Sequence, residues 1–120
     1  MKSPTNKTRL LTLVDKFLRD KFIYIDEKIE TLQHPDYMLQ GLEISGVLRG
    51  DCDDISTLHA ALLTALGVPV RFVAIRSIKE DPNFDHVYIE ANDGNEWIMY
   101  DITLSLGTII NYFGRVAIQV

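Results

Sequence analysis

The sequence predicts an α+β domain in which N-terminal helices and a central cysteine-bearing helix pack on an antiparallel β-sheet. Apolar residues recur at helical spacing over residues 5–24 and again over 51–66. Residues 68–75 are rich in β-branched and aromatic side chains, as strands are. Two further extended runs flank Asp93-Gly94, a pair typical of a β-hairpin.

Bulk composition indicates one domain spanning residues 1–120. A chain of this length with 47% hydrophobic and 24% charged residues can bury a single core. A net charge of -5 argues against nucleic acid as a partner, because phosphate binding needs a basic surface. No apolar run approaches the roughly 18 residues that span a bilayer, so we expect no membrane partner and a soluble, cytoplasmic protein.

The first predicted helix covers residues 5–24 and begins near Ser3-Pro4. Asp15 and Asp20 interleave with its basic residues, which favours a solvated face over a membrane-binding one. The apolar stripe comprises Leu10, Leu13, Val14, Phe17, Leu18 and Phe22. Residues 26–49 have a weaker pattern of short helical turns and loops, interrupted at His34-Pro35, Gly41 and Gly46.

The second predicted helix covers residues 51–66 and ends at Gly67, with Pro69 just beyond. We expect it to be buried through a stripe of Ile55, Leu58, Ala61, Leu62, Ala65 and Leu66. The following strand, 68–75, is apolar at both its odd-numbered and its even-numbered positions, so it should be central and covered on both faces. Residues 109–120 can supply further strands.

The hairpin pattern brings a histidine next to an aspartate. If Asp93 and Gly94 form a two-residue type I′ turn, Glu90 lies opposite Trp97, Tyr88 opposite Met99, and His86 opposite Asp101. Directly opposed residues have Cβ atoms roughly 5 Å apart, which allows an imidazole to carboxylate hydrogen bond. Trp97, Met99 and Tyr88 are expected to pack rather than react.

The single cysteine, Cys52, lies in the predicted first turn of the second helix. The helix dipole and unpaired N–H groups there favour a thiolate, whereas Asp51, Asp53 and Asp54 repel one. We therefore expect these aspartates to cap the helix, to face solvent, or to pair with an arginine. The candidate arginines are Arg49, Arg71 and Arg76.

A cysteine, a histidine and a carboxylate together are the parts of nucleophilic acyl transfer. A lone cysteine is more often an inert buried residue, and it is the predicted His86–Asp101 pair that favours catalysis. His59 lies seven residues along the helix from Cys52, about 10 Å of axial rise, too far for proton transfer. His34 is expected in a loop.

Cofactor and metal chemistry have little support, and we expect neither. One cysteine and three scattered histidines have no zinc-ligand spacing. Asp51-x-Asp53 could belong to a magnesium-dependent phosphotransferase, but that motif directly follows an apolar strand, and Arg49-Gly50 intervenes here.

The segments "GDCDDISTLHAALLTALGVPVRFV", "HVYIEA" and "EWIMYDIT" resemble the transglutaminase-like superfamily of papain-type folds. Its core motifs are a helix opening with Gly-x-Cys, a strand starting at His and a strand ending at Asp, and the similarity covers about residues 50–103. The resemblance implies a cysteine-proteinase-type core with Cys52 as nucleophile, His86 as base and then acid, and Asp101 as orienter of the imidazole. The GDCDD form is similar to small bacterial and phage members, which implies an alternative location in a virion.

The sequence departs from the family at two positions, since Ile102 stands where proline is common and Tyr88 where tryptophan is common. Calcium activation and protein cross-linking, which accompany the extra β-domains of animal members, are not implied. The family often takes a second oxyanion donor from a side chain upstream of the cysteine, here Gln33, Tyr37 or Gln40.

The expected function is therefore a cysteine-dependent acyl-transfer enzyme acting on a peptide or protein substrate. Hydrolysis, as in a protease or amidase, is favoured over transfer to an amine. The alternative is a non-catalytic binding or assembly module that retains the fold.

Overall fold

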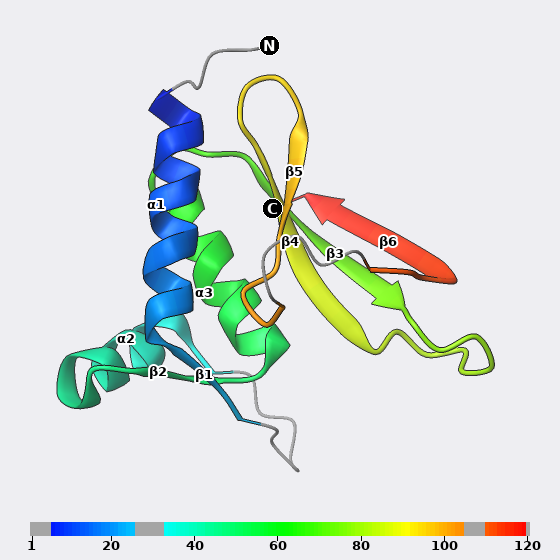
Figure 1. Ribbon diagram of the computed structural model, residues 1–120, viewed down its shortest axis with the longest axis horizontal. Coiled ribbons are helices and arrows are strands. Elements are labelled where there is room, and N and C mark those ends of the chain that lie inside the picture. Colours follow the sequence, from blue (N-terminus) through cyan, green and yellow to red (C-terminus); the bar gives the residue numbers. More distant parts are fainter. Residues whose placement is uncertain (1–5, 26–32, 105–109, 120) are drawn as a thin grey trace.

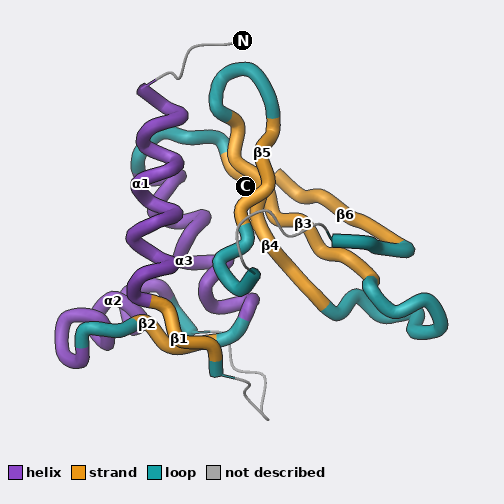
Figure 2. Tube along the Cα trace, viewed as in Figure 1, coloured by secondary structure: helices purple, strands orange, loops and turns teal. Residues whose placement is uncertain are grey.

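The computed structural model describes residues 6–25, 33–104 and 110–119, and it confirms the α+β fold class. Helices and a four-stranded antiparallel sheet lie side by side, with α1 and α3 against one face of the sheet (Figures 1 and 2). The elements are α1 Asn6–Lys21, β1 Phe22–Tyr24, α2 Pro35–Ser45, β2 Leu48–Gly50, α3 Cys52–Ala65, β3 Val70–Arg76, β4 His86–Asn92, β5 Trp97–Tyr100 and β6 Gly114–Gln119. Within the described ranges, no helix combines the length and apolarity needed to cross a membrane.

The first helix is shorter than predicted. It ends at Lys21, because Phe22–Tyr24 pairs in parallel with Leu48–Gly50 as β1 and β2. Its buried face agrees with the prediction at Leu18, which is fully buried, but differs elsewhere: Leu11 is also fully buried, whereas the predicted core residues Leu13 and Phe17 are exposed. The predicted start at Ser3-Pro4 lies outside the described residues.

Residues 35–45 form a continuous helix, α2, where only short turns were predicted. The His34 side chain caps its start by accepting a hydrogen bond from the Asp36 N–H, and Pro35 occupies the first turn, where its missing N–H costs nothing. Gly46 ends the helix with φ of 78°, a left-handed conformation that favours glycine. The weaker part of the pattern, residues 26–32, lies outside the described residues.

The cysteine-bearing helix, α3, agrees closely with its prediction. It is capped by Asp51 and Leu66, and it buries Ile55 and Leu58 as expected. The buried face continues through Ala60 and Leu63. The last turn is different, because the predicted core residues Ala61, Ala65 and Leu66 are exposed.

The sheet has the strand order β5-β4-β3-β6, so the predicted central strand is central. One face forms a core with α1 and α3 through Leu11, Ala60, Leu63, Val70, Val68, Ile89 and Ala91. On the other face Val73, Ile75 and Tyr88 pack together with Ile110. The C-terminal strand β6 pairs with β3, which confirms that the tail supplies a strand.

The predicted hairpin register is wrong by two residues. Asn92 lies opposite Trp97 and Glu90 opposite Met99, so Asp93 precedes the turn instead of lying within it. The reason is the Asp93 side chain, whose Oδ1 accepts hydrogen bonds from the Asn95 and Glu96 N–H groups at 2.8 and 2.9 Å.

A shift of two residues preserves the face of every side chain, because the strand period is two. Trp97 and Met99 therefore still share the face of His86, as expected. The predicted direct pairing of His86 with Asp101 does not occur in the ladder, because β5 ends at Tyr100.

Candidate active site

The start of α3 is held by a reciprocal capping box. The Asp51 side chain accepts a hydrogen bond from the Asp54 N–H at 3.1 Å, and the Asp54 side chain accepts one from the Asp51 N–H at 3.1 Å. Cys52 is the first residue of the helix, so its own N–H has no partner within the helix. The capping role expected of the aspartates is confirmed for Asp51 and Asp54.

Asp54 is fully buried and also joins the helix to the chain before α2. Its Oδ1 accepts a hydrogen bond from the Gln33 N–H at 2.8 Å. A carboxylate buried in this way must be paired with donors to be tolerated. No sequence pattern pointed to Gln33 as one of those donors.

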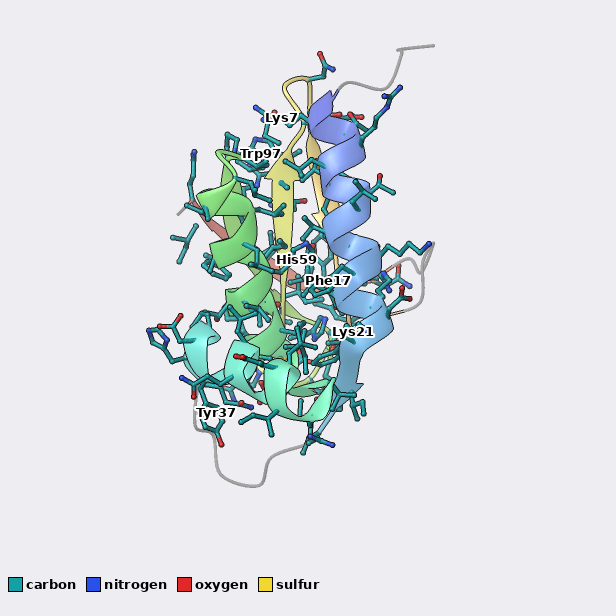
Figure 3. All side chains as sticks on the ribbon, turned by 90° about the vertical axis from the view of Figure 1, so that its left-hand side faces the viewer. Lys7, Phe17, Lys21, Tyr37, His59 and Trp97 are labelled. Atoms are coloured by element: carbon teal, nitrogen blue, oxygen red, sulfur yellow. The ribbon has the colours of Figure 1, made fainter. Side chains whose placement is uncertain are left out.

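The Gln33 side chain lies at the start of α3, but its Nε2 donates to Arg49 O at 3.0 Å and to Asp54 Oδ2 at 3.1 Å. Both amide hydrogens are thereby directed into the structure instead of towards an oxyanion. The other two candidate donors, Tyr37 and Gln40, are exposed on α2, with the Tyr37 ring on its outer side (Figure 3).

Asp53 is exposed, as one of the expectations for the aspartates allowed. The candidate arginine partners bond elsewhere: Arg49 to Ser45, Arg71 to Glu90 and Arg76 to Phe113. Partial burial, together with the nearby charge of Asp54, raises the pKa of the Asp51 carboxyl.

His86 and Asp101 form the closest contact of the site. His86 Nε2 lies 2.5 Å from Asp101 Oδ2, and the two side chains are 20% and 2% exposed. The Cys52 side chain also lies close enough to the imidazole to raise the pKa of His86. Because Nε2 is bonded to Asp101, Nδ1 is the ring nitrogen left for the thiol. The structure thus brings together the three predicted site residues.

The charges at the site favour a protonated imidazole. Hydrogen bonds, first to Asp101 and then to Cys52, raise the pKa of His86 from 6.5 to about 10, against the opposing effect of burial. Burial alone would raise the pKa of Asp101, but hydrogen bonds from His86 and Thr103 bring it below its usual value. The Thr103 N–H and hydroxyl donate to Asp101 Oδ1 at 3.0 and 2.6 Å, which leaves Oδ2 for the imidazole.

The segment before His86 is also anchored. The Asp85 N–H donates to Ile75 O at 3.0 Å, and the Ser77 N–H donates to Asp85 Oδ1 at 2.7 Å. These bonds close the β3–β4 connection directly before the histidine and so fix where β4 begins.

Arg19 on α1 holds the chain that follows β5. Its Nη2 donates to Asp101 O at 2.8 Å, its Nη1 donates to Leu104 O, and its Nε donates to Asp15 Oδ2 at 2.9 Å. Asp15 is buried, although the sequence pattern placed both residues on the solvated face. Arg19 therefore positions Asp101 through the backbone, a role that helical periodicity cannot reveal.

His59 lies between α1 and α3 (Figure 3). It is 1% exposed, and its ring packs edge-on against Tyr100 at 5.8 Å. Burial, with a further contribution from the charge of Arg19, lowers the pKa of His59 to about 4. His59 is therefore a buried packing residue, a role that the sequence analysis did not assign to it.

The family model of the transglutaminase-like superfamily matches residues 1–102, so the chain belongs to this superfamily. A solved structure from Cytophaga hutchinsonii, described as a "putative cysteine protease", has the same fold with a TM-score of 0.62 and 22% identity. That match covers 82% of this chain and 32% of the other, so this chain spans about a third of that protein's length. No curated protein matches the chain.

Replacing Gly50 by alanine should destabilise the helix start. A Cβ at this position would lie 2.7 Å from Asp54 Cβ and 2.8 Å from its Oδ2, and the buried carboxylate has no room to retreat. We expect a loss of about 1–3 kcal/mol in the free energy of unfolding, measured by urea denaturation. Gly41→Ala is the control, because nothing lies within 4 Å of its added Cβ and alanine favours a helix. Equal stability of the two variants would contradict the packing argument.

The ion pair of His86 should make stability depend on pH. Because the pKa of His86 is raised, the pair's contribution is complete below pH 6.5 and is lost as the pH rises towards about 10. Asp101→Asn removes the largest cause of the shift, so the free energy of unfolding should fall less steeply over that interval. Both proteins are compared in a Cys52→Ala background, which removes the thiol's own titration. Identical slopes would show that Asp101 does not hold the proton on His86.

Arg19→Met should cost about 2–4 kcal/mol of unfolding free energy, because it leaves the buried Asp15 unpaired and frees the chain after Asp101. The double variant Asp15→Asn/Arg19→Met should recover part of the loss, since it also removes the unpaired charge. Arg9→Met, at an exposed position of the same helix, is the matched control and should change stability by less than about 0.5 kcal/mol. A loss no larger than that of the control would exclude an anchoring role.

Proposed function

We propose that this member of the transglutaminase-like superfamily is a cysteine-dependent acyl-transfer enzyme acting on peptide or amide bonds. The proposal rests on one observation above all: the His86 ring lies 2.5 Å from Asp101 and near enough to Cys52 for that side chain to raise the pKa of His86. An imidazolium so held stabilises a thiolate beside it and keeps a proton ready for a leaving group. In this proposal Cys52 is the nucleophile, His86 the acid and base, and Asp101 the residue that orients the ring.

In the first half-reaction the Cys52 thiolate attacks the substrate carbonyl, and the resulting oxyanion lies at the start of α3. The Cys52 N–H is the donor available there, and the helix dipole adds to its effect. His86 then gives its proton to the departing amine as the C–N bond breaks. The products are a free amine and a thioester on Cys52.

In the second half-reaction His86, now neutral, takes a proton from water as the water oxygen attacks the thioester. The C–S bond breaks, the carboxylic acid leaves, and the thiolate–imidazolium pair is restored. Hydrolysis in this form, as by a protease or amidase, is the outcome that we favour. An amine in place of water would complete acyl transfer through the same residues.

The proposed mechanism requires His86 to take up the thiol proton, so the rate at which Cys52 reacts with iodoacetamide should persist well below pH 8. The chain contains one cysteine, so intact-mass spectrometry reports on Cys52 alone. Release of p-nitrophenol from p-nitrophenyl acetate should depend on the same thiol and should leave an acetyl group on it. His86→Ala should lower both rates by about 100-fold or more at neutral pH, and Cys52→Ala should abolish them.

His34→Ser is the matched control, because serine preserves the cap of α2 while removing a histidine distant in sequence from the site. It should retain both rates. A wild-type thiol that reacts with the pH profile of free cysteine, and equally fast after His86→Ala, would instead favour the non-catalytic binding or assembly module.

A further inference from the structure

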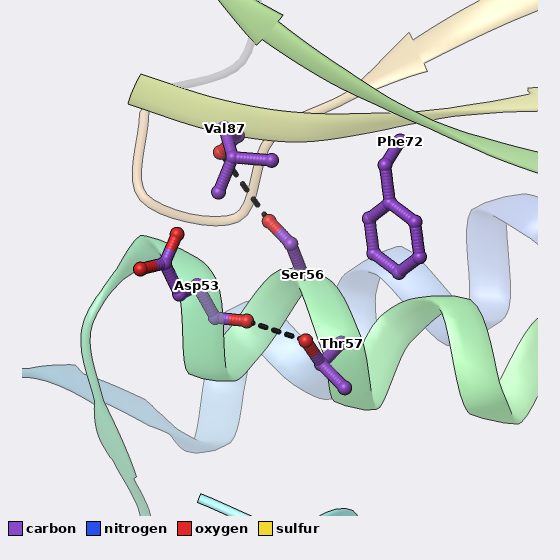
Figure 4. A pocket seen from close by; sticks show the side chains of 5 residues that line it. All are labelled: Asp53, Ser56, Thr57, Phe72 and Val87. Atoms are coloured by element: carbon purple, nitrogen blue, oxygen red, sulfur yellow. Dashed lines mark hydrogen bonds between the residues drawn. The ribbon is translucent and has the colours of Figure 1, made fainter. Parts of the chain in front are cut away.

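A hollow of about 300 Å³ lies between α3 and the sheet (Figure 4). This volume is at the small end of the range for ligand sites, which suits a single side chain better than a large cofactor. Its walls are formed by Asp53, Ser56, Thr57, Phe72 and Val87.

The hollow lies beside the first turns of the helix that carries the proposed nucleophile, because Asp53 and Ser56 are in its wall. Ser56 is four residues after Cys52 on α3, so the two lie on one face of the helix, one turn and about 6 Å of rise apart. The Ser56 hydroxyl donates to Val87 O at 3.3 Å, and Val87 directly follows His86 in β4. A substrate carbonyl at Cys52 would thus have the hollow within reach of its neighbouring side chains.

The inner surface of the hollow is suited to an apolar group. Phe72 and Val87 contribute hydrocarbon, and the two hydroxyls are directed at the protein itself, Ser56 to Val87 O and Thr57 to Asp53 O at 2.8 Å. The only charged side chain among the lining residues is Asp53, which is exposed at the rim and would repel an acidic group.

The apolar surface continues beyond the hollow onto β6. Ile118 lies opposite Phe72 and Val116 opposite Ala74, so these β6 side chains share the face that lines the hollow. Ile118 is 65% exposed and Val116 is 44% exposed. An extended peptide leaving the hollow would therefore meet further apolar contacts on this side of α3.

We propose that this hollow binds an aliphatic or aromatic side chain of a peptide acyl donor, within two residues of the carbonyl that Cys52 attacks, and disfavours an acidic side chain there. An extended chain rises about 3.3 Å per residue, so two residues span about the same distance as the one helical turn between Cys52 and Ser56. The side chain in the hollow is therefore at most two residues from the attacked carbonyl. This inference rests on the proposed function and adds its substrate class.

The test uses N-acetyl dipeptidyl chloromethyl ketones, in which the thiolate displaces chloride and forms a thioether. The pairs are Gly-Gly, Leu-Gly, Gly-Leu, Glu-Gly and Gly-Glu, and each rate is divided by the iodoacetamide rate of the same protein. Leucine at one of the two positions should raise labelling by about tenfold or more over Gly-Gly, because an apolar pocket gains at least that from a whole side chain. Glutamate at that position should label more slowly than glycine.

Thr57→Phe fills the hollow from its helical wall and should abolish the advantage of leucine, with each rate again divided by the iodoacetamide rate of the same variant. Thr64→Phe is the matched control, because it makes the same change at an exposed position of α3 that is not among the lining residues, and it should keep the advantage. Asp53→Asn should raise the glutamate rate by about two- to fivefold.

Equal labelling by all the dipeptides, or a leucine advantage that survives Thr57→Phe, would overturn the inference. Failure of the proposed function is detected separately, by an iodoacetamide pH profile equal to that of free cysteine. An ordinary thiol also reacts with chloromethyl ketones, so the side-chain preference of the hollow can be measured in either case.

Discussion

The candidate site depends on one buried carboxylate at the start of α3. Asp54 is fully buried, and it accepts hydrogen bonds from the N–H groups of Asp51 and Gln33 and from the Gln33 amide. These bonds join β2, the helix and the chain before α2 at the point where Cys52 begins the helix. They also explain the crowd of acidic residues around the only thiol. Asp51 and Asp54 have backbone donors for their charges, and Asp53 is the exposed member of the three.

The carboxylate of Asp101 is positioned by different means, because it belongs to neither a helix nor a strand. Thr103 holds one of its oxygens, and Arg19, from the other end of the chain, holds its backbone carbonyl. The charge of Asp15 in turn pairs with the same guanidinium. Because both its backbone and its carboxylate are fixed, Asp101 loses little further conformational entropy when it orients an imidazole. General acid and base chemistry requires this kind of preorganisation.

Structure that depends on neighbouring residues could be predicted from the sequence, whereas contacts between residues distant in the sequence could not. The cap, length and end of α3 follow from Asp51, Gly67 and helical spacing, and these were predicted. The hairpin was misplaced by two residues because the choice between Asp93 as the first turn residue and Asp93 as a side-chain cap depends on small energy differences. A shift of two residues leaves the alternation of side chains along the strands unchanged, so His86 and Asp101 were still assigned to the same face of the sheet. Arg19 and Gln33 could not have been assigned, because their partners are distant in sequence.

The position of α3 divides one face of the sheet into two parts with different roles. On one side α1 packs against α3, β3 and β4 through Leu11 and brings Arg19 to Asp101, so this half is closed and fixes the backbone of the carboxylate proposed to orient His86. On the other side the described residues of β6 remain largely exposed, and the hollow beside Ser56 opens there. The proposed mechanism needs both conditions at one thiol, because it must hold its acid and base in place while a substrate chain enters. Cys52 is the first residue of the dividing helix, and the residue after it, Asp53, already lines the hollow on the open side.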